Sequence, residues 1–281
     1  MKLIADSGST KTTWVLLDGT PSGKTIRTQG LNPYFHTPGS VRTILAEELV
    51  PEVAASDVCE IYFYGAGCST PNKNALLAEA MKTCFGNAEI RVYHDILGAA
   101  RALLGNEEGI ACILGTGCNS CYYDGTDIRM GVPSLGYLFG DEGAGSNIGK
   151  RFLEAYLKER VPADLRDEFR KVHPYTLEEI LNALYNLPNP NRFLASFSEF
   201  IAPRISHPFL VELVLSSLLA FFEEQVKKYE NYLEVPVSFV GSIAFHYKPL
   251  LLEAAGMNSV TVGRILKSPI EGLVEYHTAG N

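Results

Sequence analysis

The fold is decided by a stretch near the start of the chain, LIADSGSTKTTWVLLDG at residues 3–19. In it an apolar run ends in a turn of small and polar residues, a second apolar run follows, and Asp-Gly closes the pattern. Such a pattern predicts two antiparallel strands joined by a glycine turn. The stretch IACILGTGCNSCYYDG at residues 110–125 has the same succession of strand, glycine turn, strand and Asp-Gly. The chain is therefore predicted to contain a duplicated unit.

The elements expected after each hairpin have the same order in both halves. The first half predicts strands at 24–28, 60–64 and 89–93 and helices at 40–55, 73–84 and 95–104. The second half predicts strands at 128–132, 235–240 and 259–262, a long helical region at 141–229, and helices after 245 and at 269–277. Each half is thus an α/β domain of βββαβαβα order with a mixed five-stranded sheet, at residues 1–107 and 108–281. We expect the two domains to face each other across a cleft that holds the functional residues.

Composition excludes several classes of protein. The 281 residues are 46% hydrophobic and 20% charged, which is ordinary for a globular protein. The formal net charge is −8 and no stretch gathers basic residues, which argues against a nucleic-acid partner. Asp6 comes too soon for a signal peptide, and the longest apolar run, 210–222, is interrupted by Glu212. We expect a cytoplasmic protein without a membrane partner, with the helix at 210–229 in the core.

Six cysteines are present, and two of them, Cys118 and Cys121, form a Cys-x-x-Cys. This spacing is compatible with a redox pair or with half of a zinc site. No second pair of suitable ligands accompanies it, and both residues fall in a predicted strand together with Cys112. We therefore expect reduced cysteines that are buried for structural reasons.

The two glycine turns are candidates for binding phosphate. Small residues let an anionic ligand approach the backbone N–H groups closely, and the first turn adds a carboxylate, hydroxyls and an ammonium group. This is the combination that the phosphates of a metal–nucleotide complex require, although an ordinary hairpin turn with a solvated Asp6 would look alike. The candidate residues are Asp6, Gly8, Ser9, Thr10, Lys11 and Thr12 in the first turn and Gly115, Thr116 and Gly117 in the second, with Asp6 as the metal ligand.

Two other phosphate-binding patterns fail on this sequence. A Walker motif needs four residues between its glycines and a hydroxyl after the lysine, whereas GSNIGKR at 145–151 has three and ends in arginine. The stretch GAGSNIG at 143–149 does not have the glycine spacing of a dinucleotide site and does not follow a strand. Of these candidate phosphate-binding patterns, only the two hairpin turns remain.

Four motifs together resemble a known family over nearly the whole chain. The segments 3–12 and 113–120 resemble the two phosphate motifs of the actin-like ATPase superfamily of sugar kinases, and 239–244 resembles its adenosine motif. The block GYLFGDEGAGS at 136–146 is similar to the Gly-Asp-Glu-Gly-Ser block of the N-acetylhexosamine branch. The closest resemblance is to the N-acetylglucosamine kinase group, which is related to the ATPase subunits of benzoyl-CoA reductase. The resemblance implies duplicated ribonuclease H-like domains, as in other actin-like ATPases.

The resemblance also implies an activity and residue roles. It implies an ATP-dependent kinase of an N-acetylated amino sugar, with Mg²⁺ as cofactor and Asp95 as the general base for the sugar hydroxyl. The residues implied for adenosine are Gly241 and Ser242, and those implied for the sugar are Asn32, Asp95, Asn119, Gly136 and Asp141. Simpler roles exist for three of these residues. Asp95 and Asp141 could cap helices, and Asn32 precedes a proline as in an ordinary turn. His94 is expected to point elsewhere and to be structural.

Other members of the superfamily offer alternatives. One is an N-acetylmuramic acid kinase, since the residues that would read a lactyl group are not recognisable. Another is a nucleotide-driven activator or a sugar sensor without kinase turnover, although the cysteine pair of the iron–sulfur activators is not recognisable here. A sensor would not need the carboxylate of Asp95. By the same resemblance we expect a homodimer.

Overall fold

The computed structural model describes residues 1–8, 10–19 and 23–279. The chain divides into two compact units, Met1–Asn106 together with Ser268–Asn281, and Glu107–Lys267. In this division the C-terminal helix belongs to the first unit, whereas the sequence-based limits assign it to the second domain. Each unit is described by itself below.

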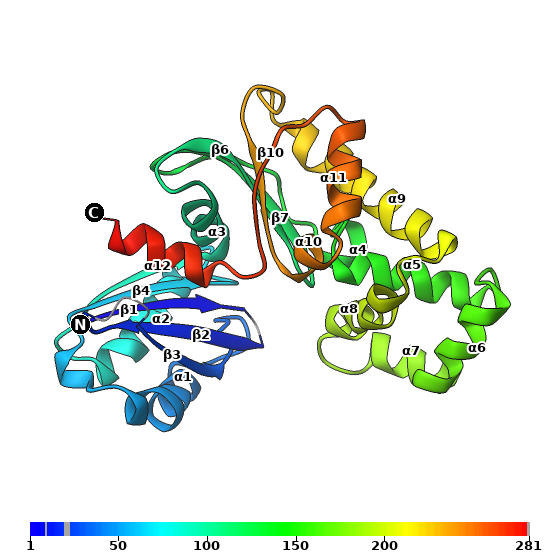
Figure 1. Cartoon of the computed structure of the whole chain (residues 1–281). Coiled ribbons are helices and arrows are strands. Elements are labelled where there is room, and N and C mark those ends of the chain that lie inside the picture. Colours follow the sequence, from blue (N-terminus) through cyan, green and yellow to red (C-terminus); the bar gives the residue numbers. More distant parts are fainter. Residues whose placement is uncertain (9, 20–22, 280–281) are drawn as a thin grey trace. The chain divides into compact units, whose positions relative to one another are not determined.

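The first unit is a mixed sheet with helices on both faces (Figure 1). Its strands lie in the order β3-β2-β1-β4-β5, and they are β1 (Lys2–Ser7), β2 (Lys11–Leu17), β3 (Lys24–Gln29), β4 (Glu60–Gly65) and β5 (Glu89–His94). Strands β1 to β3 are antiparallel, while β1, β4 and β5 run parallel. The helices are α1 (Pro38–Ile44), α2 (Pro71–Cys84), α3 (Asp95–Leu104) and α12 (Ile270–Thr278). Helices α1 and α2 pack together, as do α3 and α12.

The second unit repeats this sheet. Its strands lie in the order β10-β9-β6-β7-β8, and they are β6 (Glu108–Leu114), β7 (Cys118–Asp124), β8 (Ile128–Gly131), β9 (Val237–Val240) and β10 (Val262–Leu266). Its helices are α4 (Gly136–Phe139), α5 (Gly145–Leu157), α6 (Ala163–Val172), α7 (Leu177–Tyr185), α8 (Pro190–Ile201), α9 (Pro208–Glu224), α10 (Ser242–His246) and α11 (Lys248–Met257). Helices α4 to α9 are inserted between β8 and β9. The predicted duplicated α/β fold of the ribonuclease H-like type is confirmed.

The limits of several elements differ from the predictions. The helix predicted at 40–55 ends earlier, because α1 passes into a π-helical turn, Leu45–Leu49, and a 3-10 turn that contains Pro51. Proline has no backbone N–H, so the α-helical bonding pattern is interrupted there. The long helical region is divided into separate helices, and the first of them, α5, begins at Gly145 rather than at 141. The strand predicted at 259–262 begins at Val262, because the chain still turns at Ser259, where φ is 57°.

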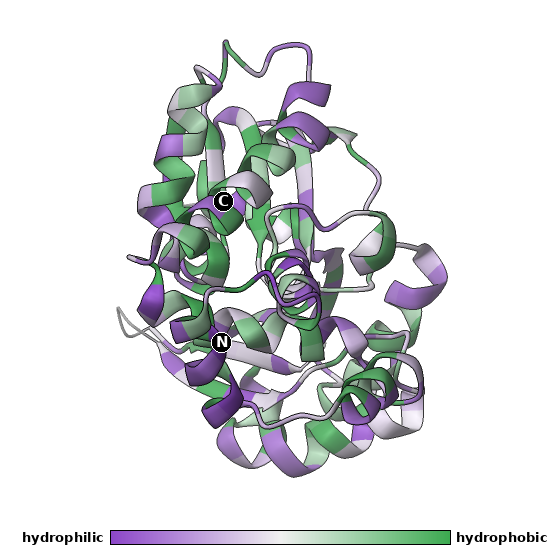
Figure 2. Cartoon of the chain, turned by 90° about the vertical axis from the view of Figure 1, so that its right-hand side faces the viewer, coloured by the Kyte–Doolittle hydropathy of each residue, from purple (hydrophilic) through white to green (hydrophobic). Residues whose placement is uncertain are grey.

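Hydrophobic side chains fill the interior of each unit. In the first unit Trp14, on β2, is fully buried, and its indole N–H donates to Thr28 Oγ1 at 3.0 Å. In the second unit α9 contributes Leu210, Val214 and Phe221 to the core, which confirms that the apolar helix at 210–229 is internal. Helices carry both hydrophilic and hydrophobic segments in Figure 2, as expected when one side of a helix is buried. None of the helices in the described ranges is long and apolar enough to cross a membrane.

Helix α12 is held in the first unit by close packing and by a buried histidine. A Cβ atom at Gly272 would overlap the carbonyl oxygen of Ala102 on α3, so this contact requires glycine. The hydroxyl of Tyr64 lies 2.9 Å from His277 Nε2 and also accepts a hydrogen bond from Arg101. Burial, together with the positive charges of Lys2 and Arg101, lowers the pKa of His277 from 6.5 to about 4. His277 is therefore neutral in the folded protein at neutral pH.

This histidine should make the protein sensitive to acid. Between pH 6.5 and 4 the unfolded chain binds a proton at His277 that the folded chain excludes, so the free energy of unfolding decreases as the pH falls through this window. The contribution is roughly 2–4 kcal/mol, at 1.36 kcal/mol per unit of pKa difference. His277→Gln keeps an acceptor for Tyr64 but does not titrate, so its stability should decline less in this window. Urea unfolding at pH 4.5 and 7.5 tests this, with exposed His246→Gln as control; parallel pH profiles for all three proteins would disprove it.

Candidate functional site

The carboxyl ends of three parallel strands gather polar residues in the first unit. Ser7, Gly65 and His94 occupy adjacent positions in register at the ends of β1, β4 and β5. In open α/β sheets ligands bind at this edge, just beyond the carboxyl ends of the strands. Asp6 precedes Ser7 and Asp95 follows His94, so both predicted functional carboxylates belong to this edge.

Asp6 is a partly exposed carboxylate in an unfavourable electrostatic environment. Burial, together with the negative charge of Asp95, raises its pKa from 3.8 to about 7, although Lys11 and a hydrogen bond from Ser268 act in the opposite direction. Asp6 and Asp95 therefore interact repulsively when both are ionised. A cation near the two carboxylates would relieve this repulsion.

The first glycine turn is held by hydrogen bonds within the hairpin. The N–H of Gly8 donates to the carbonyl of Lys11 at 3.0 Å, and the hydroxyls of Ser7 and Thr12 are 2.7 Å apart. Thr12 is buried, and its hydroxyl donates to the carbonyl of Gln29 at 3.0 Å. Its described contacts thus stabilise the hairpin. Gly8, Thr10 and Lys11 are exposed at the turn.

Predicted residue Ser9 lies outside the described residues. The loop before α1 is tied to the first turn, because the N–H of Leu31 donates to Ser7 Oγ at 3.1 Å. Asn32 follows and is buried, with its side-chain oxygen accepting from the N–H of Tyr34 at 2.9 Å. Gly67 packs against this side chain, and a Cβ there would overlap its oxygen. The structure thus brings Asn32 near the turn that contains Asp6.

Asp95 begins helix α3 but does not cap it. The N-cap residue is His94, whose Nδ1 lies 3.3 Å from the N–H of Ile96. The simple interpretation of Asp95 as an N-cap is therefore wrong, although a carboxylate in the first turn is still favoured by the helix dipole. The expectation that His94 points to a different side is also wrong, because its Nδ1 lies 2.8 Å from Asp95 Oδ1.

The glycine turn of the second unit is joined to the start of helix α5. The N–H of Gly145 donates to the carbonyl of Gly115 at 2.9 Å, and that of Ser146 donates to the carbonyl of Thr116 at 3.0 Å. Thr116 is exposed at the turn, and a Cβ added at Gly115 would meet no described atom within 4 Å. The turn is thus held by the first residues of α5, while the side of Gly115 where a Cβ would lie is free of described atoms.

The predicted adenosine residues lie beside this turn. Gly241 has φ of 131°, and a Cβ there would overlap the carbonyl oxygen of Leu114, immediately before the turn. Only glycine fits a position with both constraints. Ser242 follows as the exposed first residue of α10. The second and third motifs of the sequence are therefore adjacent within the second unit.

Asp141 precedes helix α5 and anchors the second turn. Its Oδ1 accepts from the N–H of Cys118 at 3.0 Å, and its Oδ2 accepts from the hydroxyl of Ser146 at 3.2 Å. The residue is buried in the left-handed region, with φ of 59°, and Gly117 packs against its carboxylate. Burial raises its pKa, and the two hydrogen bonds oppose the shift. Because α5 begins at Gly145, the interpretation of Asp141 and Glu142 as residues of the helix start is wrong.

Removing this carboxylate should destabilise the protein. Asp141→Ala leaves the Cys118 N–H and the Ser146 hydroxyl without their acceptor. Two buried groups that lose their partners cost roughly 2–6 kcal/mol in unfolding free energy. Urea unfolding of the variant beside Asp127→Ala, at an exposed position, measures the loss. Equal stabilities for the two variants would show that Asp141 does not anchor the turn.

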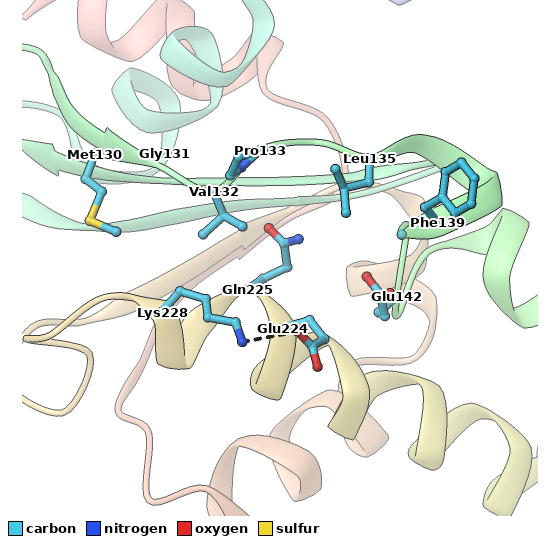
Figure 3. A pocket seen from close by; sticks show the side chains of 11 residues that line it. Met130, Gly131, Val132, Pro133, Leu135, Phe139, Glu142, Glu224, Gln225 and Lys228 are labelled. Carbon is cyan, nitrogen blue, oxygen red and sulfur yellow. Dashed lines mark ion pairs between the residues drawn. The ribbon is translucent and has the colours of Figure 1, made fainter.

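Two predicted sugar residues have few fixed contacts. Asn119, on β7, is half-buried, and its side-chain oxygen accepts from the N–H of Ser120 at 2.9 Å. Gly136 begins α4 with φ of 67°. A pocket of about 620 Å³ lies between β8, α4 and the end of α9 (Figure 3). Of the 136–146 block it is lined by Phe139, Gly140 and Glu142, and none of the predicted sugar residues lines it.

Among the described residues, neither the pattern of a metal-binding site nor that of a reactive cysteine is found. No group of three or more His, Cys, Asp or Glu side chains with metal-binding geometry occurs in the described ranges. All six cysteines are free, and Cys112, Cys118 and Cys121 are buried, as predicted. Burial raises the pKa of each of these three thiols, which keeps them protonated and unreactive.

Several solved structures resemble this chain over nearly its whole length. A candidate N-acetylglucosamine kinase from Porphyromonas gingivalis is 42% identical, with 100% of this chain and 99% of that chain covered and a TM-score of 0.95. A candidate N-acetylglucosamine kinase from Chromobacterium violaceum is 15% identical over 98% of each chain, with a TM-score of 0.74. A ROK-family glucokinase from Streptomyces griseus, in complex with glucose and AMPPNP, is 14% identical over 99% and 98% of the two chains, with a TM-score of 0.58. The last two likenesses show the fold alone. No protein-family model and no curated protein matches the sequence.

Proposed function

Because the chain belongs to the N-acetylglucosamine kinase-like sugar kinases of the actin-like ATPase superfamily, we propose that it transfers phosphate from ATP to an N-acetylated amino sugar, with N-acetylglucosamine as the first candidate. The observation that carries this proposal is the full-length likeness, at 42% identity, to a candidate N-acetylglucosamine kinase. The glycine-rich block at 136–146 supports the same branch of the family. That the chain is an ATP-dependent sugar kinase follows from its membership of this family.

Asp95 is proposed as the general base. It lies at the carboxyl edge of the first sheet, partly exposed, and is accessible to a substrate hydroxyl. In the reaction the sugar oxygen forms a bond to the γ-phosphorus of ATP, and the bond from this phosphorus to the bridging oxygen breaks. ADP leaves with that electron pair, and the hydroxyl proton passes to the Asp95 carboxylate. Such a transfer depends mainly on positioning and charge neutralisation.

The nucleotide is proposed to use the two glycine turns and the third motif. Gly8, Thr10 and Lys11 in the first turn and Thr116 in the second are exposed, and these turns are the proposed contacts for phosphate oxygens. The N–H groups of Gly8 and Gly115 are already bonded within their own turns. Gly241 and Ser242 are the proposed adenosine contacts. Ser9 and Thr12 remain predicted phosphate residues, although the hydroxyl of Thr12 is already bonded to Gln29.

The residues present also fit a magnesium ion. Asp6 supplies an oxygen ligand, which this ion prefers, and its raised pKa reflects a negatively charged, partly dehydrated position. When bound, the ion would neutralise charge on the transferred phosphate. With one protein carboxylate proposed, the remaining ligands would be phosphate oxygens and water, as is common for this ion.

This assignment predicts a change in metal dependence. Asp6→Asn keeps the size of the side chain but removes the negative charge, so the Mg²⁺ concentration for half-maximal activity should increase roughly tenfold or more, equivalent to about 1.4 kcal/mol. Titration of Mg²⁺ at fixed ATP measures the effect, with Asp57→Asn at an exposed position as control. An unchanged requirement in Asp6→Asn would exclude Asp6 as the ligand.

The sugar specificity is tested by a screen of ADP release. N-acetylglucosamine, N-acetylmannosamine, N-acetylmuramic acid, glucosamine and glucose are offered at equal concentrations. The proposal predicts the highest kcat/KM for an N-acetylated sugar. Preference for glucose would reject the amino-sugar assignment. A preference for N-acetylmuramic acid would select the alternative acceptor. ATP hydrolysis unaffected by any sugar would select an activator ATPase.

A homodimer and a cytoplasmic location also remain predictions from the resemblance. Analytical sedimentation of the purified protein would test the homodimer.

A further inference from the structure

One oxygen of the proposed general base is buried beside the neighbouring histidine. Asp95 Oδ1 is buried, and no hydrogen bond from another group reaches it in the described part of the chain. His94 Nδ1 lies 2.8 Å away, within hydrogen-bond distance. The Asp95 side chain is nevertheless 29% exposed. Since Oδ1 is buried, Oδ2 is the polar atom that this exposure leaves for a substrate.

The proton between these two atoms can be placed by chemical argument. His94 Nδ1 has two neighbours, Asp95 Oδ1 at 2.8 Å and the N–H of Ile96 at 3.3 Å. It can accept from Ile96 only if it carries no proton, but it would then present a lone pair to a carboxylate oxygen. The shorter, charge-assisted contact is the stronger one, so Nδ1 carries the proton and donates it to Oδ1. The hydrogen bond that His94 donates to Asp95 also raises the pKa of His94.

We propose that His94 is a positioning residue for sugar phosphorylation: its Nδ1–H holds Oδ1 of Asp95 and thereby directs Oδ2 to the substrate hydroxyl. The proposal rests on the proposed role of Asp95 as the general base. Adjacent residues at a strand-to-helix junction are suited to this task, because β5 fixes His94 and α3 fixes Asp95. A carboxylate held in one orientation loses little freedom when it accepts the proton. His94 itself does not contact the reacting atoms.

The test replaces His94 and follows turnover. His94→Leu removes the donor at similar size, so kcat should fall roughly 10- to 10²-fold, as is typical when a supporting hydrogen bond is lost. KM for ATP and the thermal shift caused by Mg-ATP should stay as in the unaltered protein, because His94 is not a nucleotide residue. If kcat remains within twofold of the parental value, the proposal is overturned.

Two amide variants of His94 distinguish the loss of the hydrogen bond to Asp95 from the loss of side-chain packing. They also replace the leucine variant as the test if that variant does not fold. Asn places its amide nitrogen where Nδ1 lies, whereas Gln places it where Nε2 lies. His94→Asn should therefore recover kcat to within about threefold, while His94→Gln should stay near the leucine value. Equal turnover of the two variants would contradict the proposal.

A double-mutant cycle shows whether His94 acts through Asp95. In an Asp95→Asn background, His94→Leu should reduce the residual turnover by less than about twofold, because the group that it positions is already gone. A full 10- to 10²-fold loss in that background would mean an independent role and would overturn the inference. If the unaltered protein phosphorylates no sugar, it is the proposed function that fails, and this is seen before any variant is measured.

Discussion

Asp95→Asn is expected to lower the turnover of sugar phosphorylation by roughly 10²–10⁴-fold. The variant keeps the shape of the side chain and an oxygen that can accept a hydrogen bond, but an amide cannot take up the hydroxyl proton. The binding of ATP should be retained, since none of the proposed phosphate contacts is changed. Steady-state kinetics and the melting temperature are measured on the same preparation.

The structure makes this variant more informative than the sequence alone suggests. His94, rather than Asp95, is the N-cap of α3, so the amide does not replace a capping carboxylate. The variant also removes one of two mutually repelling carboxylates, because the charge of Asp95 contributes to the raised pKa of Asp6. The fold should therefore be at least as stable as before. A stable variant with parental turnover would rule out Asp95 as the base.

Gly115→Val is expected to abolish the stabilisation of the protein by Mg-ATP. A ligand at one hundred times its dissociation constant stabilises the folded state by about 2.7 kcal/mol. A side chain at position 115 would stand in front of the turn, where a Cβ meets no described atom within 4 Å. The fold should accept valine there, whereas a phosphate could no longer approach the backbone. Thermal unfolding with and without Mg-ATP measures the difference.

The neighbouring glycine is a poorer choice for this experiment. A Cβ at Gly117 would lie 2.9 Å from the carboxylate of Asp141, so a valine would disturb the anchor of the turn as well as its surface. Gly256→Val, on α11 of the same unit, is a matched control, because a Cβ there also meets no described atom within 4 Å. It should leave the thermal shift intact. A normal shift in Gly115→Val would remove the second turn from the nucleotide site.

The duplicated sheet could be predicted from the sequence because its signals are local. Each hairpin consists of two apolar runs joined by a glycine turn and followed by Asp-Gly, and the two sheets have the same strand order. The position of Asp95 directly after a strand could be predicted in the same way. The limits of helices and strands were harder to predict. Pro51 and the turn at Ser259 determine them through backbone geometry, which the spacing of hydrophobic residues does not indicate.

The features that sequence reasoning missed depend on contacts between distant or unexpectedly oriented groups. The role of Asp141 as an anchor needs Cys118, which lies 23 residues earlier in the chain. The return of α12 to the first unit depends on the fit of Gly272 against Ala102. From the sequence, His94 is predicted to point away from Asp95. At the junction with α3 the backbone leaves the strand, and both side chains come together.

The proposed phosphorylation of an N-acetylated amino sugar by ATP can be tested directly. The most direct measurement is mass spectrometry of the sugar after incubation of the purified protein with Mg-ATP and N-acetylglucosamine, with Asp95→Asn as the matched preparation. We expect a phosphorylated sugar and an equal amount of ADP with the unaltered protein, and far less of both with the variant. ADP without any phosphorylated sugar, or a phosphorylated sugar formed equally fast by Asp95→Asn, would contradict it.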